Sequence, residues 1–166
     1  MHRILTLASL ALALTTLPAA AQMVTLSPAQ IGQVFCISRL GNDMAPVQGL
    51  LTPALTQAIA DAEKSNAAWA TANPGDKPPL GDGIPWQTYQ DYAPECTVGP
   101  VDPVMDEALV EIVYAFPESP DANFIDKLHL VEVEDPTQSE PVWRIDNVEY
   151  SEGGDLRAAL VSAFAN

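Results

Sequence analysis

The sequence predicts an α+β fold, with two N-terminal helices and one C-terminal helix packed on an antiparallel sheet of about four strands. Helical patterns occupy the first part of the chain, and strand patterns follow one another in the second part. The predicted strands are joined by short turns, whereas parallel strands would need long crossover connections. This order of elements favours a sheet with its helices gathered on one face.

The first 21 residues predict a cleavable secretory signal peptide. Arg3 gives a basic start, residues 4–17 form an uncharged apolar run, and residues 19–21 are all alanine, which is the pattern of a leader with its cleavage site. The apolar run is shorter than the roughly 20 residues that cross a bilayer. We therefore expect cleavage near Ala21-Gln22, no membrane span, and one mature domain over residues 22–166 that is periplasmic or secreted.

Acidic residues dominate the charge of the mature chain. The full sequence has 22 acidic and seven basic residues, and Arg3 is lost with the leader, which leaves six basic residues and a net charge of −16. A field of this sign repels nucleic acids and anionic lipids and attracts basic partners. A solvated acidic surface without a partner is the simpler interpretation. The sequence contains no pattern from which we would predict a cofactor or a metal site.

Two longer helices are predicted before any strand. Ser27 can cap the first helix and form a capping box with Gln30, and Gly41 marks its end. Thr52 followed by proline repeats the start signal. The second helix should run to about Ala72, because the Asn-Pro-Gly sequence that follows cannot continue it.

Residues 73–103 are rich in proline and glycine, but Trp86 and other aromatic residues give this segment large side chains to bury. We therefore predict an ordered, irregular arm rather than a linker. In the last strand the inward parity slips between Ile145 and Val148, which indicates a bulge. Over residues 128–133 the pattern fits either face of the sheet. The other expected elements are a helical turn at 45–51, strands at 96–101, 108–116, 124–134 and 142–150, and a final helix from Asp155 that includes Phe164.

Cys36 and Cys96 are the two cysteines of the chain. In an oxidising compartment such a pair usually forms a disulfide. A bridge across about 60 residues would stabilise the fold by roughly 4 kcal/mol and would attach the arm to the first helix. Two buried thiols or a redox pair are the alternatives, although the spacing is far from the C-x-x-C pattern of redox sites.

Several short motifs spread over most of the mature chain form a pattern with a known counterpart. They are Phe35-Cys36, Leu51-Thr52-Pro53-Ala54-Leu55, Gly83-Ile84-Pro85-Trp86, Asp91 with Cys96, Trp143-Arg144-Ile145-Asp146-Asn147, Tyr150 and Leu156-Arg157. With the order of helices and strands, they resemble the NTF2-like superfamily, and more narrowly the exported bacterial domain of unknown function catalogued as DUF3828. The resemblance implies a cone-shaped half-barrel with helices over the concave face of a curved sheet. It carries over no catalytic residue, and it makes a homodimer through the sheet one expectation.

Asp91 is the main candidate for a catalytic group. It lies in the arm with Asp82 and Glu95, and Trp86 and Tyr89 are close to it in sequence. An aspartate beside aromatic rings can have a raised pKa and act as a general base, with Tyr89 as the proton donor. The simpler interpretation is that these acids cap turns and that the aromatic residues pack in the core.

His129, Arg144 and Tyr150 are, with Trp86 and Asp91, the residues that we expect to face a pocket. His129 has no nucleophile motif or further metal ligands around it, so a structural or solvent-facing role is the simpler interpretation. Arg144 shares one face of its strand with Asp146 unless the bulge intervenes, and it either holds an anionic ligand or forms a cross-strand or intra-strand ion pair. The ion pair is the simpler of the two, and Tyr150 is best explained as a core or rim aromatic.

These observations favour two classes of function. The first is a non-enzymatic binding or interaction module of the cell envelope, whose partner is another envelope protein of basic charge or a small apolar ligand. The alternative is a small acid–base enzyme, such as an isomerase, dehydratase or hydrolase, that uses Asp91 in the pocket. The first class is favoured because no catalytic constellation is recognisable in the sequence.

Overall fold

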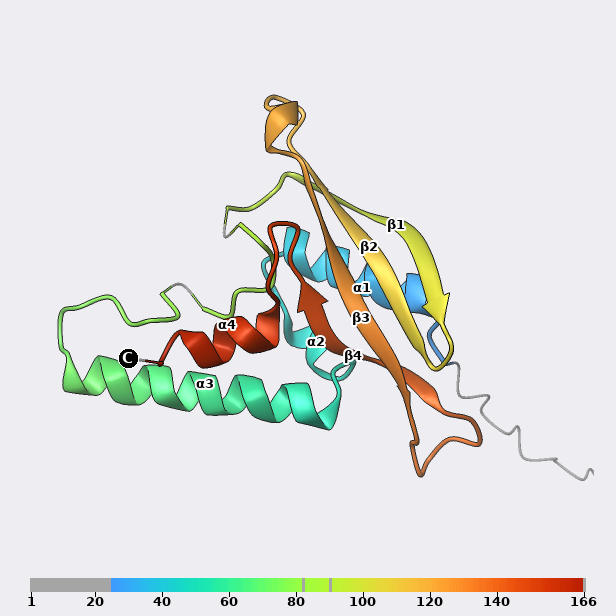
Figure 1. The fold of residues 1–166 in the computed structure, drawn as a ribbon, viewed down its shortest axis with the longest axis horizontal. Coiled ribbons are helices and arrows are strands. Elements are labelled where there is room, and N and C mark those ends of the chain that lie inside the picture. Colours follow the sequence, from blue (N-terminus) through green and yellow to red (C-terminus); the bar gives the residue numbers. More distant parts are fainter. Residues whose placement is uncertain (1–24, 82, 90, 166) are drawn as a thin grey trace, which may run out of the picture.

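The structure, a computed structural model, describes residues 25–81, 83–89 and 91–165 (Figure 1). The predicted signal peptide and its cleavage site lie outside these described residues, and so does Asp82. Within the described ranges, no helix is long and apolar enough to pass through a membrane.

Four strands form one antiparallel sheet in which each strand pairs with its neighbour in sequence. This confirms the prediction of an α+β fold with a four-stranded antiparallel sheet. The first strand is longer than expected, because Pro100 and Pro103 are tolerated on a strand at the edge of the sheet. In chain order the strands are β1 (Glu95–Val104), β2 (Glu107–Ala115), β3 (Phe124–Val133) and β4 (Val142–Glu149).

The longer helices begin at side chains that cap them. The Gln30 N–H donates to Ser27 Oγ at 3.4 Å and the Ser27 N–H donates to Gln30 Oε1 at 2.9 Å, which is the predicted capping box. Thr52 caps the second long helix, and Asp155 caps the last one. Phe164 lies beyond this last helix, which is shorter than expected. The helices are α1 (Pro28–Leu40), α2 (Ala45–Gln48), α3 (Pro53–Ala72), the short 3-10 helix η1 (Pro120–Ala122) and α4 (Leu156–Ser162).

The hydrophobic core lies between the sheet and the helices. Helix α1 crosses β1 and β2, while α3 and α4 pack together beside β4 (Figure 1). Phe35 of α1, Ile112 of β2 and Ile145 of β4 are completely buried there. Leu128 of β3 is also completely buried, which decides the inward face that the sequence pattern left open. His129 consequently lies on the opposite face of the sheet.

Strand β4 contains the bulge that the sequence predicts. The register between β3 and β4 shifts by one residue, so that Asp146 has no partner between Ile145 and Asn147. The extra residue allows both Ile145 and Val148 to be completely buried although they are three positions apart. The side chain of Asp146 therefore does not follow the alternation of inward and outward side chains along the strand.

Cys36 and Cys96 form a disulfide that joins α1 to β1, as predicted. Their Cα atoms are 5.3 Å apart, and the two residues are separated by 60 positions in the sequence. The closed loop contains α2, α3 and the irregular arm, which the structure limits to residues 73–94. The arm therefore returns to the core next to α1.

Candidate functional site

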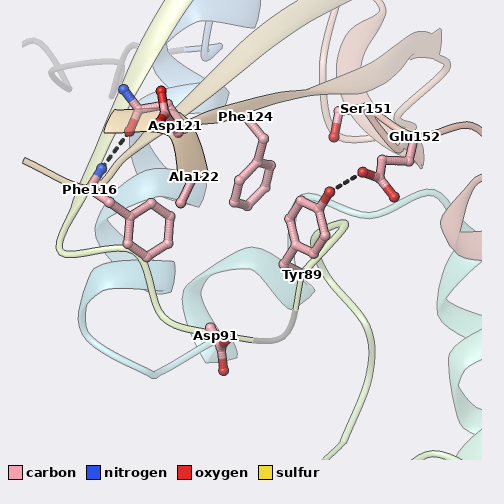
Figure 2. A pocket seen from close by; sticks show the side chains of 9 residues that line it. Tyr89, Asp91, Phe116, Asp121, Ala122, Phe124, Ser151 and Glu152 are labelled. Carbon is pink, nitrogen blue, oxygen red and sulfur yellow. Dashed lines mark hydrogen bonds between the residues drawn. The ribbon is translucent and has the colours of Figure 1, made fainter. Parts of the chain in front are cut away.

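A cavity of about 530 Å³ opens beside the connection between β2 and β3. Three segments that are distant in sequence form its walls: the end of the arm, the β2–β3 connection and the turn between β4 and α4 (Figure 2). The lining residues are Tyr89, Asp91, Phe116, Asp121, Ala122, Asn123, Phe124, Ser151 and Glu152. The fold thus brings two of the predicted site residues, Tyr89 and Asp91, to one cavity.

Three aromatic rings form the apolar wall of this cavity (Figure 2). The buried Phe124 ring stacks on Tyr114 of the core, with the ring centroids 4.5 Å apart. Tyr89 meets Phe124 edge to face, at 5.1 Å and an interplanar angle of 80°. The ring centroids of Phe116 and Phe124 are 6.4 Å apart. These are favourable arrangements of aromatic rings, and the core fixes the central ring of the wall.

Acidic side chains surround the aromatic wall. Asp91, Asp121 and Glu152 line the cavity and are exposed, and none of the described lining residues is basic. The hydroxyl of Tyr89 donates a hydrogen bond to Glu152 (Figure 2). This hydrogen bond is the main cause of the raised pKa of Tyr89, followed by desolvation, and the charges of Glu152 and Asp126 add to it. The cavity therefore carries a negative potential.

The side chain of Gln87 attaches the arm to α1. It is almost completely buried, and its Nε2 donates to the backbone carbonyls of Tyr89 at 2.6 Å and of Asp91 at 2.9 Å. Its Oε1 accepts hydrogen bonds from Nε and Nη2 of Arg39, at 2.8 and 2.6 Å. The Arg39 guanidinium also lies over the ring of Tyr92, 5.1 Å from its centroid. One glutamine thus holds the backbone of two cavity residues.

Asp126 of β3 attaches the arm to the sheet. Its side chain is completely buried, and its carboxylate accepts from the Thr88 N–H at 2.8 Å, the Thr88 hydroxyl at 2.5 Å and the Ser151 N–H at 3.0 Å. No ion pair within the described part of the chain involves Asp126. Hydrogen bonds of this kind are what a buried carboxylate requires. Asp126 therefore joins the arm, the sheet and the turn before α4 directly behind the cavity.

The buried hydroxyl of Tyr114 should make the stability of the domain sensitive to alkaline pH. Burial raises the pKa of Tyr114 above its ordinary value of 10.0, the charge of Asp126 raises it further, and the nearby Arg39 opposes them. Above pH 10 the unfolded chain releases this proton while the folded protein keeps it. The folded state then binds more protons, so the free energy of unfolding should fall as the pH rises.

The Tyr114→Phe variant tests this dependence by urea unfolding between neutral and alkaline pH. The variant should show a shallower decline above pH 10 than the wild type. At neutral pH its free energy of unfolding should change by less than about 1 kcal/mol, because the hydroxyl has no hydrogen-bond partner among the described residues. An equally steep decline in the variant would assign the alkaline sensitivity to other groups.

Two other predicted pocket residues, Trp86 and Tyr150, do not line this cavity, although Trp86 lines a separate hollow with Ile59 and Ile84. Trp86 is buried and meets Phe35 edge to face, with the ring centroids 6.3 Å apart. The Tyr150 hydroxyl donates to the Pro85 carbonyl at 2.5 Å. Both aromatic residues therefore attach the middle of the arm to the core, and neither lines the cavity.

His129 and Arg144 also lie away from the cavity. His129 Nε2 is 3.0 Å from Glu107 Oε2 on the neighbouring strand. Arg144 Nη2 donates to Asp135 Oδ2 at 3.5 Å. Of the two alternatives for Arg144 the structure shows an ion pair, with Asp135 just beyond the end of β3, whereas the bulge turns Asp146 toward Arg157.

Residues of three of the short sequence motifs meet in a structural network. Asp146 Oδ1 accepts from the Thr52 hydroxyl at 2.8 Å and from Arg157 Nη2 at 2.6 Å. Arg157 Nε also donates to the Asp146 carbonyl at 2.7 Å, and the Thr52 N–H donates to the Ile145 carbonyl at 2.9 Å. These contacts fasten the starts of α3 and α4 to β4. None of these residues lines the cavity, so these three motifs carry information on the fold.

Sequence reasoning missed Phe116, Phe124, Asp121 and Glu152 as site residues. A usable signal existed for the two phenylalanines, since they flank the turn between neighbouring antiparallel strands and must come close together. No such signal existed for Glu152, because its position depends on how the turn after β4 packs against the arm. The site therefore depends on contacts between distant segments.

Comparisons with models of known protein families, with curated proteins and with solved structures gave no match. The functional argument therefore depends on the geometry and charge of the cavity.

Proposed function

We propose that this protein is an exported, non-enzymatic binding module that holds a small ligand, or a side chain of a protein partner, in the cavity. The observation that carries the proposal is the wall formed by Tyr89, Phe116 and Phe124. Its three rings border a concave surface, and Tyr89 is 42% exposed while Phe124 is anchored in the core. A concavity lined by aromatic rings with a few polar groups is typical of ligand sites.

Export is part of the same proposal. It is supported by the leader pattern of residues 1–21 and by the disulfide between Cys36 and Cys96, a bond that persists in oxidising compartments. Membership of the NTF2-like superfamily, and of its DUF3828 group, is supported by the network of Thr52, Asp146 and Arg157. Residues of three separate motifs contact one another in that network.

An acid–base enzyme is the second candidate function, favoured because Asp91 and Tyr89 line the same cavity. Their contacts make it the weaker of the two. The Tyr89 hydroxyl is engaged by Glu152, and its raised pKa makes it a poorer acid. Asp91 is exposed, and its side chain points away from the aromatic rings (Figure 2). A general base must reach the proton that it removes within hydrogen-bond distance.

An NMR screen with uncharged aromatic and aliphatic fragments tests the binding module. Fragments that bind should shift the amide signals of residues 116–124 and 151–152 in the same titrations, because these segments border the rings. Phe116→Ala should weaken binding about fivefold, since it removes one of the three rings. Met105→Ala is the matched control, because it removes a highly exposed apolar side chain at the far end of the β1–β2 hairpin.

Two outcomes would change the proposal. If no fragment shifts the cavity signals, or if the shifts cluster elsewhere, the cavity is not the binding site. If a bound fragment is converted into a new species, and if Asp91→Asn abolishes the conversion at an unchanged melting temperature, the enzyme becomes the better assignment.

A further inference from the structure

Carboxylates from three different segments line the cavity, although the side chain of Asp91 points away from the rings (Figure 2). Asp91 belongs to the arm, Asp121 to the β2–β3 connection and Glu152 to the turn after β4. Among the described lining residues, no lysine, arginine or histidine provides a counter-charge. A ligand in the cavity therefore meets ring faces and carboxylates but no positive group.

A fourth carboxylate acts on the cavity from behind. Asp126 is completely buried, and it accepts a hydrogen bond at 3.0 Å from the backbone of Ser151, which lines the cavity. Its field passes through protein rather than water, so it is screened less than the field of a surface carboxylate. The pKa of Tyr89 is raised mainly by its hydrogen bond to Glu152, and the charge of Asp126 adds to the same direction.

Ring faces and carboxylates favour the same class of ligand. The face of an aromatic ring carries a negative partial charge and attracts cations, and carboxylates attract them directly. The rings of Tyr89 and Phe124 stand at 80° to each other, so they can contact a rounded head group from two directions. An anion would be repelled by the carboxylates of Asp121, Glu152 and Asp126, and a neutral ligand would gain only the ring contacts.

We propose that the cavity selects an organic ammonium group, carried by a small amine or by a lysine side chain of a basic partner. The inference rests on the proposed binding function and adds the chemical class of the ligand. The alkyl chain lies on Phe116 and Phe124, and the ammonium group lies near Tyr89 and Glu152.

Three probes of one size and shape test the charge preference: butylammonium, butan-1-ol and butyrate. In NMR titrations at low salt, butylammonium should bind about tenfold more tightly than butan-1-ol, and butyrate should not bind. Raising the salt concentration to about 0.3 M should weaken the binding of butylammonium alone, because screening acts only on the charged probe.

Two matched variants test whether the preference for butylammonium over butan-1-ol arises at the cavity. The double variant Asp121→Asn/Glu152→Gln removes two charges at the cavity and should reduce the preference for butylammonium to about twofold. The double variant Asp102→Asn/Asp106→Asn makes the same change of net charge at the far end of the β1–β2 hairpin. It should keep the full preference, since these exposed residues do not line the cavity.

The outcomes separate the two proposals. Neutral fragments that bind at the cavity with no preference for butylammonium would overturn the ammonium inference and leave the binding module intact. A cavity that binds neither fragments nor butylammonium would overturn both. A lysine-containing peptide and its Nε-acetylated form then distinguish the sources. A protein partner is supported if the unmodified peptide binds more tightly than butylammonium and if acetylation abolishes this binding. A small amine is supported if the unmodified peptide and butylammonium bind with equal affinity.

Discussion

Replacing Asp126 with alanine should lower the free energy of unfolding by about 3 kcal/mol or more. The carboxylate is completely buried and is the common acceptor for the Thr88 N–H, the Thr88 hydroxyl and the Ser151 N–H. Alanine would leave both donors of Thr88 without this acceptor, while the Ser151 N–H would keep its second acceptor, the Thr88 hydroxyl, at 2.9 Å. Each donor that is shielded from water and left without a partner costs about 1–3 kcal/mol. Urea unfolding followed by circular dichroism measures the loss.

Two further variants make this result specific. Asp126→Asn keeps the side-chain volume and one acceptor oxygen, but its amide N–H₂ group faces a donor that the second oxygen had accepted from. The free energy of unfolding should therefore fall by about half as much as in the alanine variant. Asp121→Ala removes an exposed aspartate near the same strand, and it should change stability by less than about 0.5 kcal/mol. Equal losses for the alanine variants at 126 and 121 would mean that the hydrogen bonds of Asp126 contribute nothing.

Breaking the Cys36–Cys96 disulfide should cost about 4 kcal/mol, because the bridge closes a loop of about 60 residues in the unfolded chain. The double variant Cys36→Ala/Cys96→Ala and the reduced wild-type protein should both show this loss in urea unfolding. The two measurements are needed because alanine also removes sulfur atoms, and Cys36 is buried.

The single variants distinguish loss of the bridge from loss of side-chain packing. Either Cys36→Ala or Cys96→Ala already breaks the bridge, so each should lose as much stability as the double variant. Losses that add up from the single variants to the double variant would contradict the loop-closure account. In that case the stabilisation would come from the packing of the two side chains.

Most of the fold could be predicted because its signals are local. The capping box of Ser27 and Gln30 marks the start of α1, and the parity slip between Ile145 and Val148 marks the bulge of β4. The buried face of β3 could not be predicted, since Leu128 is apolar at one parity and Val131 and Val133 are apolar at the other. Contacts with α1 and β4, which no local pattern encodes, decide it.

The cavity was less predictable, because its residues meet over long distances in the chain. Tyr89 and Glu152 are 63 positions apart, and Thr88 and Asp126 are 38 positions apart. The alternation of side chains along a strand indicates which face of the sheet a residue occupies. It does not indicate which turn or arm covers that face. For Tyr89 and Asp91 the only local signal is the closeness of an acid to aromatic residues in the arm.

In its described residues, the arm around the cavity is attached by side chains that lie behind it, and none of these residues pairs with a strand of the sheet. Gln87 donates hydrogen bonds to the backbone carbonyls of Tyr89 and Asp91 rather than to their side chains. The Asp126 carboxylate accepts a hydrogen bond from the Thr88 N–H. The side chain of Asp91 can therefore be exchanged without disturbing the attachment of the backbone. The residues that attach the arm are thus different from the exposed residues that would contact a ligand. During evolution, single mutations at exposed arm positions can therefore change the ligand preference. The domain then stays above its stability threshold at every step.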